Sequence, residues 1–216
     1  MTERRANPEV RVRLLEGAAR LLAEEGPSAL TLRRVATEAD TSTMAVYTHF
    51  GSMADLADAV VDEGFRRLGA LLAGVPRTGD AITDLAGLGL AYLVNARQNP
   101  HLYAVMFGSA SLGAYRPQTA DERRRGRYTF DEIVDAARRA VDQGRLRPAE
   151  PSAVAGQLWT AMHGYVMLEV AGYFGADGVE QVLTPMFVSL LSGLGADRDA
   201  ALASMRTLAP VEARSR

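Results

Sequence analysis

The 216-residue chain contains no cysteine, only three histidines and one tryptophan, and all 24 of its basic residues are arginine. Without cysteine the chain can form neither disulfide bonds nor thiolate metal sites, and it cannot use a thiol nucleophile. His49, His101 and His163 lie far apart and do not match a metal-binding spacing such as His-Glu-x-x-His. Gly-x-Ser-x-Gly and phosphate-loop motifs are also missing. We therefore expect no enzymatic activity, no metal site and no cofactor.

Long hydrophobic runs are missing too. One of the longest stretches without Asp, Glu or Arg, residues 98–115, is interrupted by Asn99, Pro100 and several glycines, and we expect no membrane span. The first five residues are polar and charged and do not resemble a signal peptide, which favours a cytoplasmic location. With 48% hydrophobic residues and a formal net charge of −2, the composition is that of a globular protein.

Apolar residues recur with the period of an α-helix in almost every segment, and no segment alternates as a β-strand does. We therefore predict an all-α fold. Asn7, Thr31 and Ser42 are suited to cap helices, and Ser52 with Asp55 fits a capping box. The predicted helices cover residues 8–25, 32–39, 43–50, about 53–72, 80–98, 100–107, 121–143, 151–174 and 178–194, with a weaker one at 197–208.

The first three predicted helices have the spacing of a helix-turn-helix unit, because two of them are short and are separated only by a tight turn at Asp40-Thr41. We predict a DNA-binding domain over residues 1–52 and an effector-binding and dimerisation domain over residues 53–216. The helix at about 53–72 connects them, and residues 74–79 form a linker rich in glycine and proline.

The residues of this N-terminal region carry a family resemblance. Residues 31–39 read Thr-Leu-Arg-Arg-Val-Ala-Thr-Glu-Ala, and residues 42–50 read Ser-Thr-Met-Ala-Val-Tyr-Thr-His-Phe. This pattern resembles the DNA-binding domain of the TetR family of transcriptional regulators. The recognition helix of that family ends in an apolar residue, a tyrosine, two variable residues and a phenylalanine, as residues 46–50 do here. The resemblance covers about residues 8–65.

The second half of the chain adds to the resemblance. Residues 100–107 and the segment Leu-Trp-Thr-Ala-Met-His-Gly at 158–164 are similar to the effector domain of a TetR subgroup marked by Trp-x-x-x-His-Gly. The resemblance implies a homodimer that binds a double-stranded DNA operator and releases it when a small molecule occupies the C-terminal domain. Two positions depart from the family pattern: Asp40 stands where a glycine is usual, and Met53 where a phosphate-binding lysine is usual.

The candidate DNA-binding residues lie on and beside the predicted recognition helix. We expect threonine hydroxyls to reach base edges, Met44 or Ala45 to pack on a thymine methyl group, and Arg33 to contact guanine or phosphate. Residues 1–50 hold seven arginines and seven acidic residues, so this region has no net positive charge, and a single half-site would bind weakly. The full set is Thr31, Arg33, Arg34, Ser42, Thr43, Met44, Ala45, Tyr47, Thr48 and His49.

For the effector we predict a largely apolar or aromatic small molecule, because apolar and aromatic side chains recur around the helix that carries Trp159 and His163. For any single one of these side chains, a place in an ordinary core is favoured over contact with an effector, and His163 is expected to be a hydrogen-bonded structural histidine. The candidates are Tyr92, Tyr103, Met106, Phe107, Tyr128, Trp159, Met162, His163 and Val166.

The predicted helix over 151–174 is apolar on more than one side, and the one over 178–194 carries an unbroken apolar stripe. Together they favour a dimer-forming pair of helices. Pro185 lies inside the second of them, so we expect a kink there or a restart with Thr184 as the cap. The candidate interface residues are Tyr165, Leu168, Tyr173, Val182, Met186 and Leu190.

These observations favour a ligand-responsive transcriptional regulator, expected to be a repressor, that binds a palindromic operator as a homodimer. Two alternatives stay open. One is a helical small-molecule-binding protein or bundle enzyme without operator binding, which would keep ligand uptake but not retain DNA. The other is a purely structural dimer, which would have neither an effector pocket nor specific DNA binding.

Overall fold

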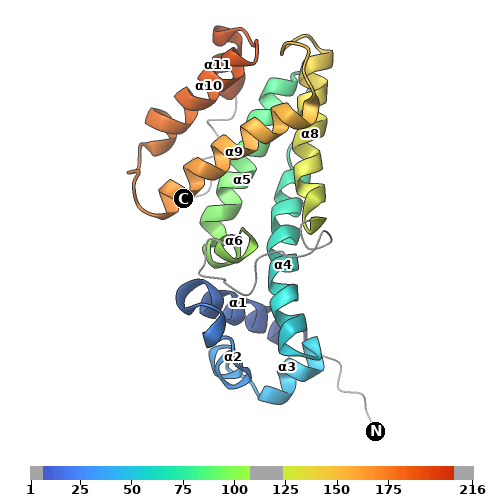
Figure 1. Cartoon of the computed structure of the whole chain (residues 1–216), viewed down its shortest axis with the longest axis vertical. Helices are drawn as coiled ribbons and strands as arrows, with labels where there is room; N and C mark the ends of the chain where they lie inside the picture. The colour runs from blue at the N-terminus through green and yellow to red at the C-terminus, as the bar shows by residue number, and fades with distance from the viewer. Residues whose placement is uncertain (1–6, 108–123, 207–216) are drawn as a thin grey trace. The chain divides into compact units, whose positions relative to one another are not determined.

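The computed structural model of the chain describes residues 7–107 and 124–206, and every regular element in these ranges is a helix (Figure 1). This confirms the predicted all-α fold. The elements are α1 (Pro8–Glu25), the 3₁₀ turn η1 (Pro27–Ala29), α2 (Leu32–Glu38), α3 (Thr43–Phe50), α4 (Met53–Ala73), α5 (Ala81–Gln98), α6 (Pro100–Met106), α8 (Arg127–Asp142), α9 (Pro151–Val170), the π-helical segment η2 (Val179–Leu183), α10 (Thr184–Gly193) and α11 (Arg198–Arg206).

The first helices begin at the capping residues that the sequence predicts. The side chain of Asn7 accepts a hydrogen bond from the Glu9 amide at 3.0 Å, and Thr31 and Ser42 cap α2 and α3 in the same way. Ser52 Oγ accepts from the Asp55 amide at 3.1 Å at the start of α4, which is one half of the predicted capping box. The other half is absent, because the Ser52 amide bonds to the Phe50 carbonyl and the Asp55 carboxylate accepts from the Ser52 hydroxyl instead. These side chains satisfy amide groups that have no partner within a helix, so each start is determined locally.

The chain divides into two compact units. The first contains residues up to Arg67 together with residues 98–126, and the second contains residues 68–97 and those from Arg127 onward. Helix α4 therefore begins in one unit and ends in the other, and α6 belongs to the first unit. The predicted domain boundary after residue 52 separates the expected DNA-binding and effector-binding functions, and it stays a prediction. The boundary between the two compact units lies later in the sequence, within α4 between Arg67 and Leu68.

In the first unit α1 packs against α2, α3 and α6, around fully buried side chains that include Leu14, Val35 and Val46. Gly17 of α1 lies against the Glu38 side chain of α2, where a Cβ atom on Gly17 would lie 2.9 Å from Glu38 Cγ. The Arg13 guanidinium also donates from Nε to the Ala39 carbonyl, at 3.1 Å. The two short helices are thereby held on α1.

In the second unit α8 packs on α9, and α10 packs on α11. Two aspartates at the start of α5 connect the ends of these helices. Asp84 is buried and accepts hydrogen bonds from Thr78 and from Arg139 of α8. Burial alone would raise the pKa of this carboxyl group, but the hydrogen bonds from Thr78 and Arg139 outweigh it and lower the pKa. Asp80 similarly bonds to Ser204 of α11, at 2.5 Å.

The predicted helix over 178–194 is corrected by the structure. Residues Val179–Leu183 form a π-helical segment, and α10 restarts at Thr184 with Pro185 in its first turn. Proline is tolerated there because an amide at the start of a helix has no intrahelical partner. Leu183 occupies the N-cap position of α10 and Thr184 is the first residue of the helix, so Thr184 does not act as the predicted cap.

Three other predicted helix bounds differ from the structure. Helix α9 ends at Val170, before the predicted residue 174, because Gly172 adopts a left-handed conformation with φ of 81°. The helices predicted over 121–143 and 197–208 extend partly outside the described residues. Residues 124–126 are described, but α8 begins only at Arg127, because Gly126 adopts a left-handed conformation with φ of 76° and interrupts the predicted helix. The second of these helices is Arg198–Arg206 in the structure.

Candidate functional site

Helix α3 is anchored on one side and exposed on the other. Val46 is completely buried, and Phe50 is partly buried, with the Arg11 guanidinium 5.4 Å from the centre of its ring. Met44 and Tyr47 are 66% and 48% exposed. Because Val46 and Phe50 are one helical turn apart, they attach the helix to the unit while the other side of α3 stays in solvent.

The small polar side chains of α3 complete this exposed face. Thr43 and Thr48 are exposed, and Thr48 Oγ1 donates a hydrogen bond to the Met44 carbonyl at 2.9 Å. The oxygen of Thr48 therefore remains an acceptor, suited to the amino groups of adenine or cytosine. Ala45 and His49 are partly buried, and the Ser42 hydroxyl already accepts a hydrogen bond from the Ala45 amide as the helix cap.

The two arginines of α2 differ in their surroundings. Arg34 forms a two-pronged ion pair with Glu25, with N–O distances of 2.7 and 2.5 Å. The hydrogen bond from Arg34 lowers the pKa of the Glu25 carboxyl group, and the same contact raises the pKa of Arg34. Arg33 is exposed and has no ion-pair partner among the described residues. Of these two predicted contacts, Arg33 is thus the available cation.

The turn between α2 and α3 contains the first departure from the family pattern. Asp40 has a φ of 47°, and it is the only described residue other than glycine with a positive φ. The Thr41 amide bonds back to the Ala36 carbonyl at 2.9 Å, which closes the end of α2. Aspartate therefore occupies the left-handed position of this turn, a conformation that it adopts more readily than most residues.

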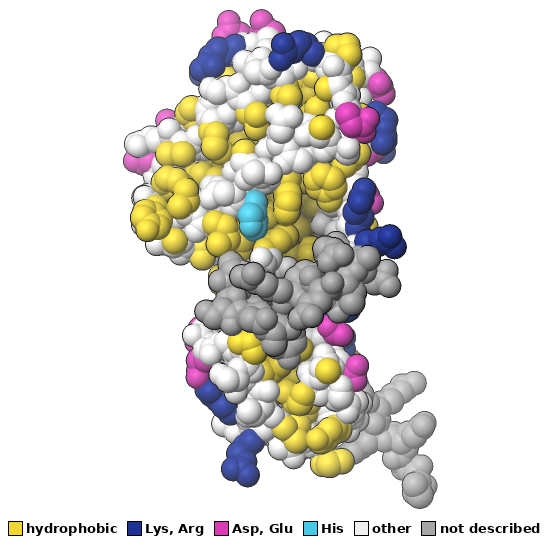
Figure 2. Space-filling view, in the orientation of Figure 1, with side chains coloured by type: hydrophobic (Ala, Val, Ile, Leu, Met, Phe, Trp, Pro, Cys, Tyr) yellow, Lys and Arg dark blue, Asp and Glu magenta, His cyan; other side chains and the backbone are white. Residues whose placement is uncertain are grey.

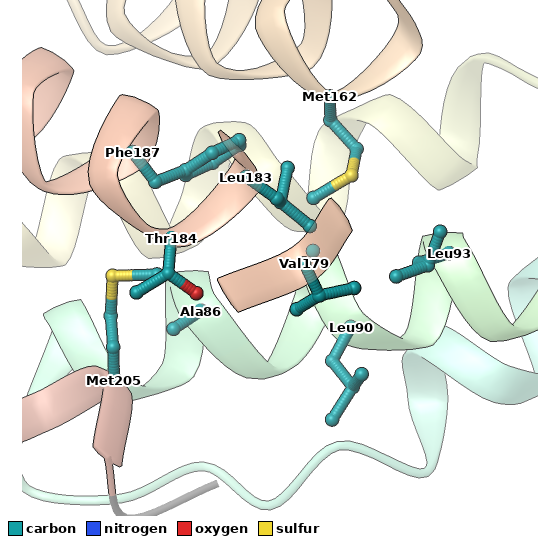
Figure 3. Close-up of a pocket in the computed structure, with 10 residues that line it drawn as sticks. Ala86, Leu90, Leu93, Met162, Val179, Leu183, Thr184, Phe187 and Met205 are labelled. Atoms are coloured by element: carbon teal, nitrogen blue, oxygen red, sulfur yellow. The ribbon is translucent and has the colours of Figure 1, made fainter. Parts of the chain in front are cut away.

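The second unit contains an apolar cavity of about 130 Å³. Its described lining comes from α5, α9, η2, α10 and α11, and Figure 3 shows these side chains gathered around one space. Thr184 supplies the only hydroxyl of this lining, and Figure 3 shows its oxygen directed from the start of α10 toward Val179. The described lining residues are Ala86, Gly89, Leu90, Leu93, Met162, Val179, Leu183, Thr184, Phe187 and Met205.

A smaller void of about 20 Å³ lies next to this cavity and shares Gly89, Met162 and Phe187 with it. Tyr92 and Trp159 also line the smaller void. Because Met162 and Phe187 line both spaces, they form part of the wall between them.

Beside the smaller void, His163 lies against α5 and its own helix. Its Nδ1 atom is 3.0 Å from the Tyr92 hydroxyl, and its ring stacks on Trp159 with 5.5 Å between centroids. Burial lowers the pKa of this histidine, which favours the neutral ring. His163 thus participates in a polar contact between α5 and α9 and is not among the described residues that line the cavity.

The predicted effector residues are divided among several places. Met162 lines the cavity, Tyr92 and Trp159 line the smaller void, and Val166 is completely buried. Tyr128 is 52% exposed on α8. The remaining three candidates, Tyr103, Met106 and Phe107, lie in or directly after α6 and belong to the first unit. The rings of Tyr103 and Phe107 are in contact there.

Most residues of the cavity wall are not among the predicted effector residues. Val179, Leu183 and Phe187 belong to the apolar stripe of the predicted helix over 178–194, a helix that the sequence assigns to the dimer interface. Met205 comes from the weakest predicted helix. The interruption at Pro185 is the one signal that this stripe does not continue as a regular helix.

The predicted dimer residues also differ in exposure. Leu168 and Tyr173 are 46% and 76% exposed, and Figure 2 shows hydrophobic side chains gathered on this side of the second unit. Val182, Met186 and Leu190 are partly buried. Tyr165 is buried within the protomer, where its ring stacks on Phe174 and its hydroxyl donates to Glu169 at 2.9 Å. Tyr165 therefore has little surface left for a partner.

Two further features concern the described part of the chain, residues 7–107 and 124–206. No helix there is long and apolar enough to cross a membrane. Nor do three or more histidine, aspartate or glutamate side chains come together there in an arrangement that could hold a metal ion.

Comparison with known proteins matches both parts of the chain. Residues 14–60 match the family model described as "Bacterial regulatory proteins, tetR family", and residues 85–194 match "Tetracyclin repressor-like, C-terminal domain". An HTH-type transcriptional regulator of Mycobacterium tuberculosis H37Rv is 28% identical over 185 residues, which cover 84% of this chain and 79% of the regulator.

Solved structures share the fold. A protein from Rhodococcus sp. RHA1 is 27% identical and has a TM-score of 0.71, with 89% of this chain and 99% of that chain covered. The structure of AibR in complex with isovaleryl coenzyme A and operator DNA is 21% identical and has a TM-score of 0.59, with 79% of this chain and 89% of AibR covered. The matched families and the regulator are transcriptional regulators and not enzymes. The narrower Trp-x-x-x-His-Gly subgroup stays a prediction.

Proposed function

The chain belongs to the TetR family of bacterial regulatory proteins, and on that premise we propose that it is a repressor that binds a palindromic operator as a homodimer. A small, largely apolar effector in the cavity of the second unit releases the operator. The observation that carries this proposal is the exposed face of α3, where Met44 and Tyr47 are in solvent although both are large and partly apolar.

The α3 face suits the major groove because its exposed side chains are narrow and mostly uncharged. Thr43 and Thr48 offer hydroxyl groups to base edges, and Met44 offers an apolar surface to a thymine methyl group. Thr31 and Tyr47 are placed to contact phosphates, and Arg33 supplies a free positive charge beside them.

One such face would bind DNA weakly, since the first 50 residues carry no net positive charge. Two faces related by dimer symmetry would engage two half-sites, separated by roughly 34–36 Å or a multiple of it. The exposed Leu168 and Tyr173 make this end of α9 the proposed dimer surface. The second subunit would thus contribute the specificity that one subunit lacks.

Release requires that the effector bind more tightly to a conformation in which the two α3 faces are wrongly spaced. A ligand with equal affinity for both conformations would release nothing. Helix α4 is the continuous element between the DNA-binding region and the cavity-containing unit, so we propose that it transmits the change. AibR, which shares the fold, has been seen with both a coenzyme A thioester and operator DNA.

Selection of bound sequences from a pool of random duplexes tests the operator proposal. We expect a palindromic sequence to be enriched. A Leu168→Arg variant, which places charge on the proposed dimer surface, should be monomeric and should bind this sequence about 100-fold more weakly, because one half-site is lost. The matched control is Ser152→Arg, at an exposed position on another side of α9.

Both variants are compared by gel shift and by sedimentation. The control should remain dimeric and bind as the unchanged protein does. If the monomeric variant bound the selected duplex as tightly as the dimer, the palindromic operator would be refuted. If no sequence were enriched, operator binding itself would be refuted.

A further inference from the structure

The cavity of the second unit has a size and polarity that restrict what it can hold. We propose that it selects an uncharged ligand, or an uncharged part of a larger one, with about six to eight non-hydrogen atoms. We further propose that Thr184 Oγ1 is the specificity-determining atom that pairs with one hydrogen-bonding group of the ligand. This inference deepens the proposed function, because it names the chemical class of the effector.

The size follows from the volume of about 130 Å³. An apolar cavity of about 150 Å³ in another protein holds a benzene molecule, so this cavity accepts one small ring or a short branched chain. A polycyclic molecule would not fit without rearrangement of the wall. The restriction applies to whatever part of the effector enters this space.

The polarity excludes a charged group. The described lining consists of hydrocarbon, thioether and phenyl groups apart from the Thr184 hydroxyl, and none of these residues is charged. Moving an ion from water into such surroundings without a partner costs several kcal/mol or more. The transfer of an apolar group carries no such free-energy cost, and removing its surface from water is favourable.

The position of Thr184 depends on the π-helical segment before it. In a regular α-helix, residues five apart are about 140° apart around the axis, so Val179 and Thr184 would face different sides. Here the Thr184 amide bonds to the Val179 carbonyl, and the wider turn brings both side chains to the cavity. Residues of α10 one turn further, including Phe187, then continue the same wall.

The Thr184 hydroxyl is available for a ligand. It makes no capping hydrogen bond and has no other hydrogen-bond partner among the described residues. Thr184 is partly exposed, and its hydroxyl is not among the buried polar atoms that lack a partner, so water can bond to it when the cavity is empty. A ligand group that pairs with the hydroxyl replaces this water, whereas an apolar ligand displaces it without replacement. Because a hydroxyl can donate and accept, the ligand group can be a carbonyl, an ether or a hydroxyl.

Three rings of nearly equal size and shape test the proposal: toluene, phenol and the permanently charged N-methylpyridinium ion. Affinities of the full-length protein for each are measured by ligand-observed NMR titration. We expect phenol to bind about 3- to 10-fold more tightly than toluene, which is the range for one net hydrogen bond. N-methylpyridinium should not bind measurably.

Two variants isolate the hydroxyl. Thr184→Val keeps the shape and should reduce phenol affinity to that for toluene, whereas Thr184→Ser should keep the preference for phenol. The matched control is Thr160→Val on α9, where the exposed threonine bonds to the Gly156 carbonyl of its own helix. This control should leave all three affinities unchanged.

Each contrary result overturns a defined part of the proposal. Binding of N-methylpyridinium as tight as that of toluene would overturn the exclusion of charge, and failure of all three rings to bind would overturn the assignment of size and class. Equal losses for phenol and toluene in Thr184→Val would overturn the role of the hydroxyl. These measurements contain no DNA, so their failure is distinguishable from a failure to enrich an operator.

Discussion

The α3 face and the apolar cavity are assembled differently. The face consists of exposed side chains from one short helix and its immediate surroundings, whereas the described lining of the cavity comes from five separate elements between Ala86 and Met205. An exposed side chain such as Met44 contributes little to folding, so it can serve recognition alone. A lining residue such as Phe187 also belongs to the buried interior. Recognition and stability are therefore separable on α3 and coupled around the cavity.

The largest expected effect tests this coupling directly. Phe187 is 6% exposed and lines both the cavity and the neighbouring void, so Phe187→Ala should destabilise the protein by about 3–5 kcal/mol. Met44→Ala on α3 is the control, and its effect on stability should stay within about 0.5 kcal/mol. Urea denaturation followed by circular dichroism measures both. Equal destabilisation by the two substitutions would contradict the proposed difference between the α3 face and the cavity wall.

A second prediction concerns a buried charge of the first unit that lies away from the α3 face. Glu63 of α4 is buried, and hydrogen bonds from Arg66 and Arg67 lower its pKa from 4.5 to about 2. A lowered carboxyl pKa stabilises the folded state above the unfolded pKa, and this contribution is lost as the pH falls from about 4.5 toward 2. Its upper limit is about 3 kcal/mol.

The measurement is the free energy of unfolding from urea titrations between pH 2.5 and 7. Glu63→Gln should remove much of the loss of stability on the acid side. The exposed Glu132 of α8 provides a control, since Glu132→Gln should leave the pH dependence unchanged. A Glu63→Gln protein with the full acid-induced loss would contradict the assignment.

The smallest expected effect separates two adjacent arginines on the DNA-binding side. Arg33→Ala should weaken operator binding about 10-fold, because an exposed cation is lost from a phosphate or guanine contact. Arg34→Ala should weaken binding by less than about 3-fold, because Glu25 already holds that guanidinium. Gel shifts at several salt concentrations measure both. If Arg34→Ala had the larger effect, the ion pair with Glu25 would not persist on DNA.

Much of the first unit could be predicted because its determinants are local. Capping side chains such as Asn7 and Ser42 bond to amides two or three residues away, so their spacing alone marks the helix starts. The left-handed turn between α2 and α3 was also visible, at an aspartate in place of glycine. The exposure of Met44 and Tyr47 follows from the burial of Val46 on the same helix.

Tertiary structure alone decided the cavity and the availability of charges. Hydrophobic periodicity indicates that Val179, Leu183 and Phe187 are buried, but it carries no information about whether they face a ligand, a partner subunit or the core. Their place in the wall depends on a π-helical turn and on Met205, which is distant in sequence. Likewise, Arg33 and Arg34 are neighbouring residues of the same type, so the sequence does not indicate which of them is available to DNA. Only the position of Glu25, on another helix, shows that Arg34 is paired. Local hydrogen bonds are encoded by short spacing, whereas a cavity or an ion pair depends on how distant segments meet.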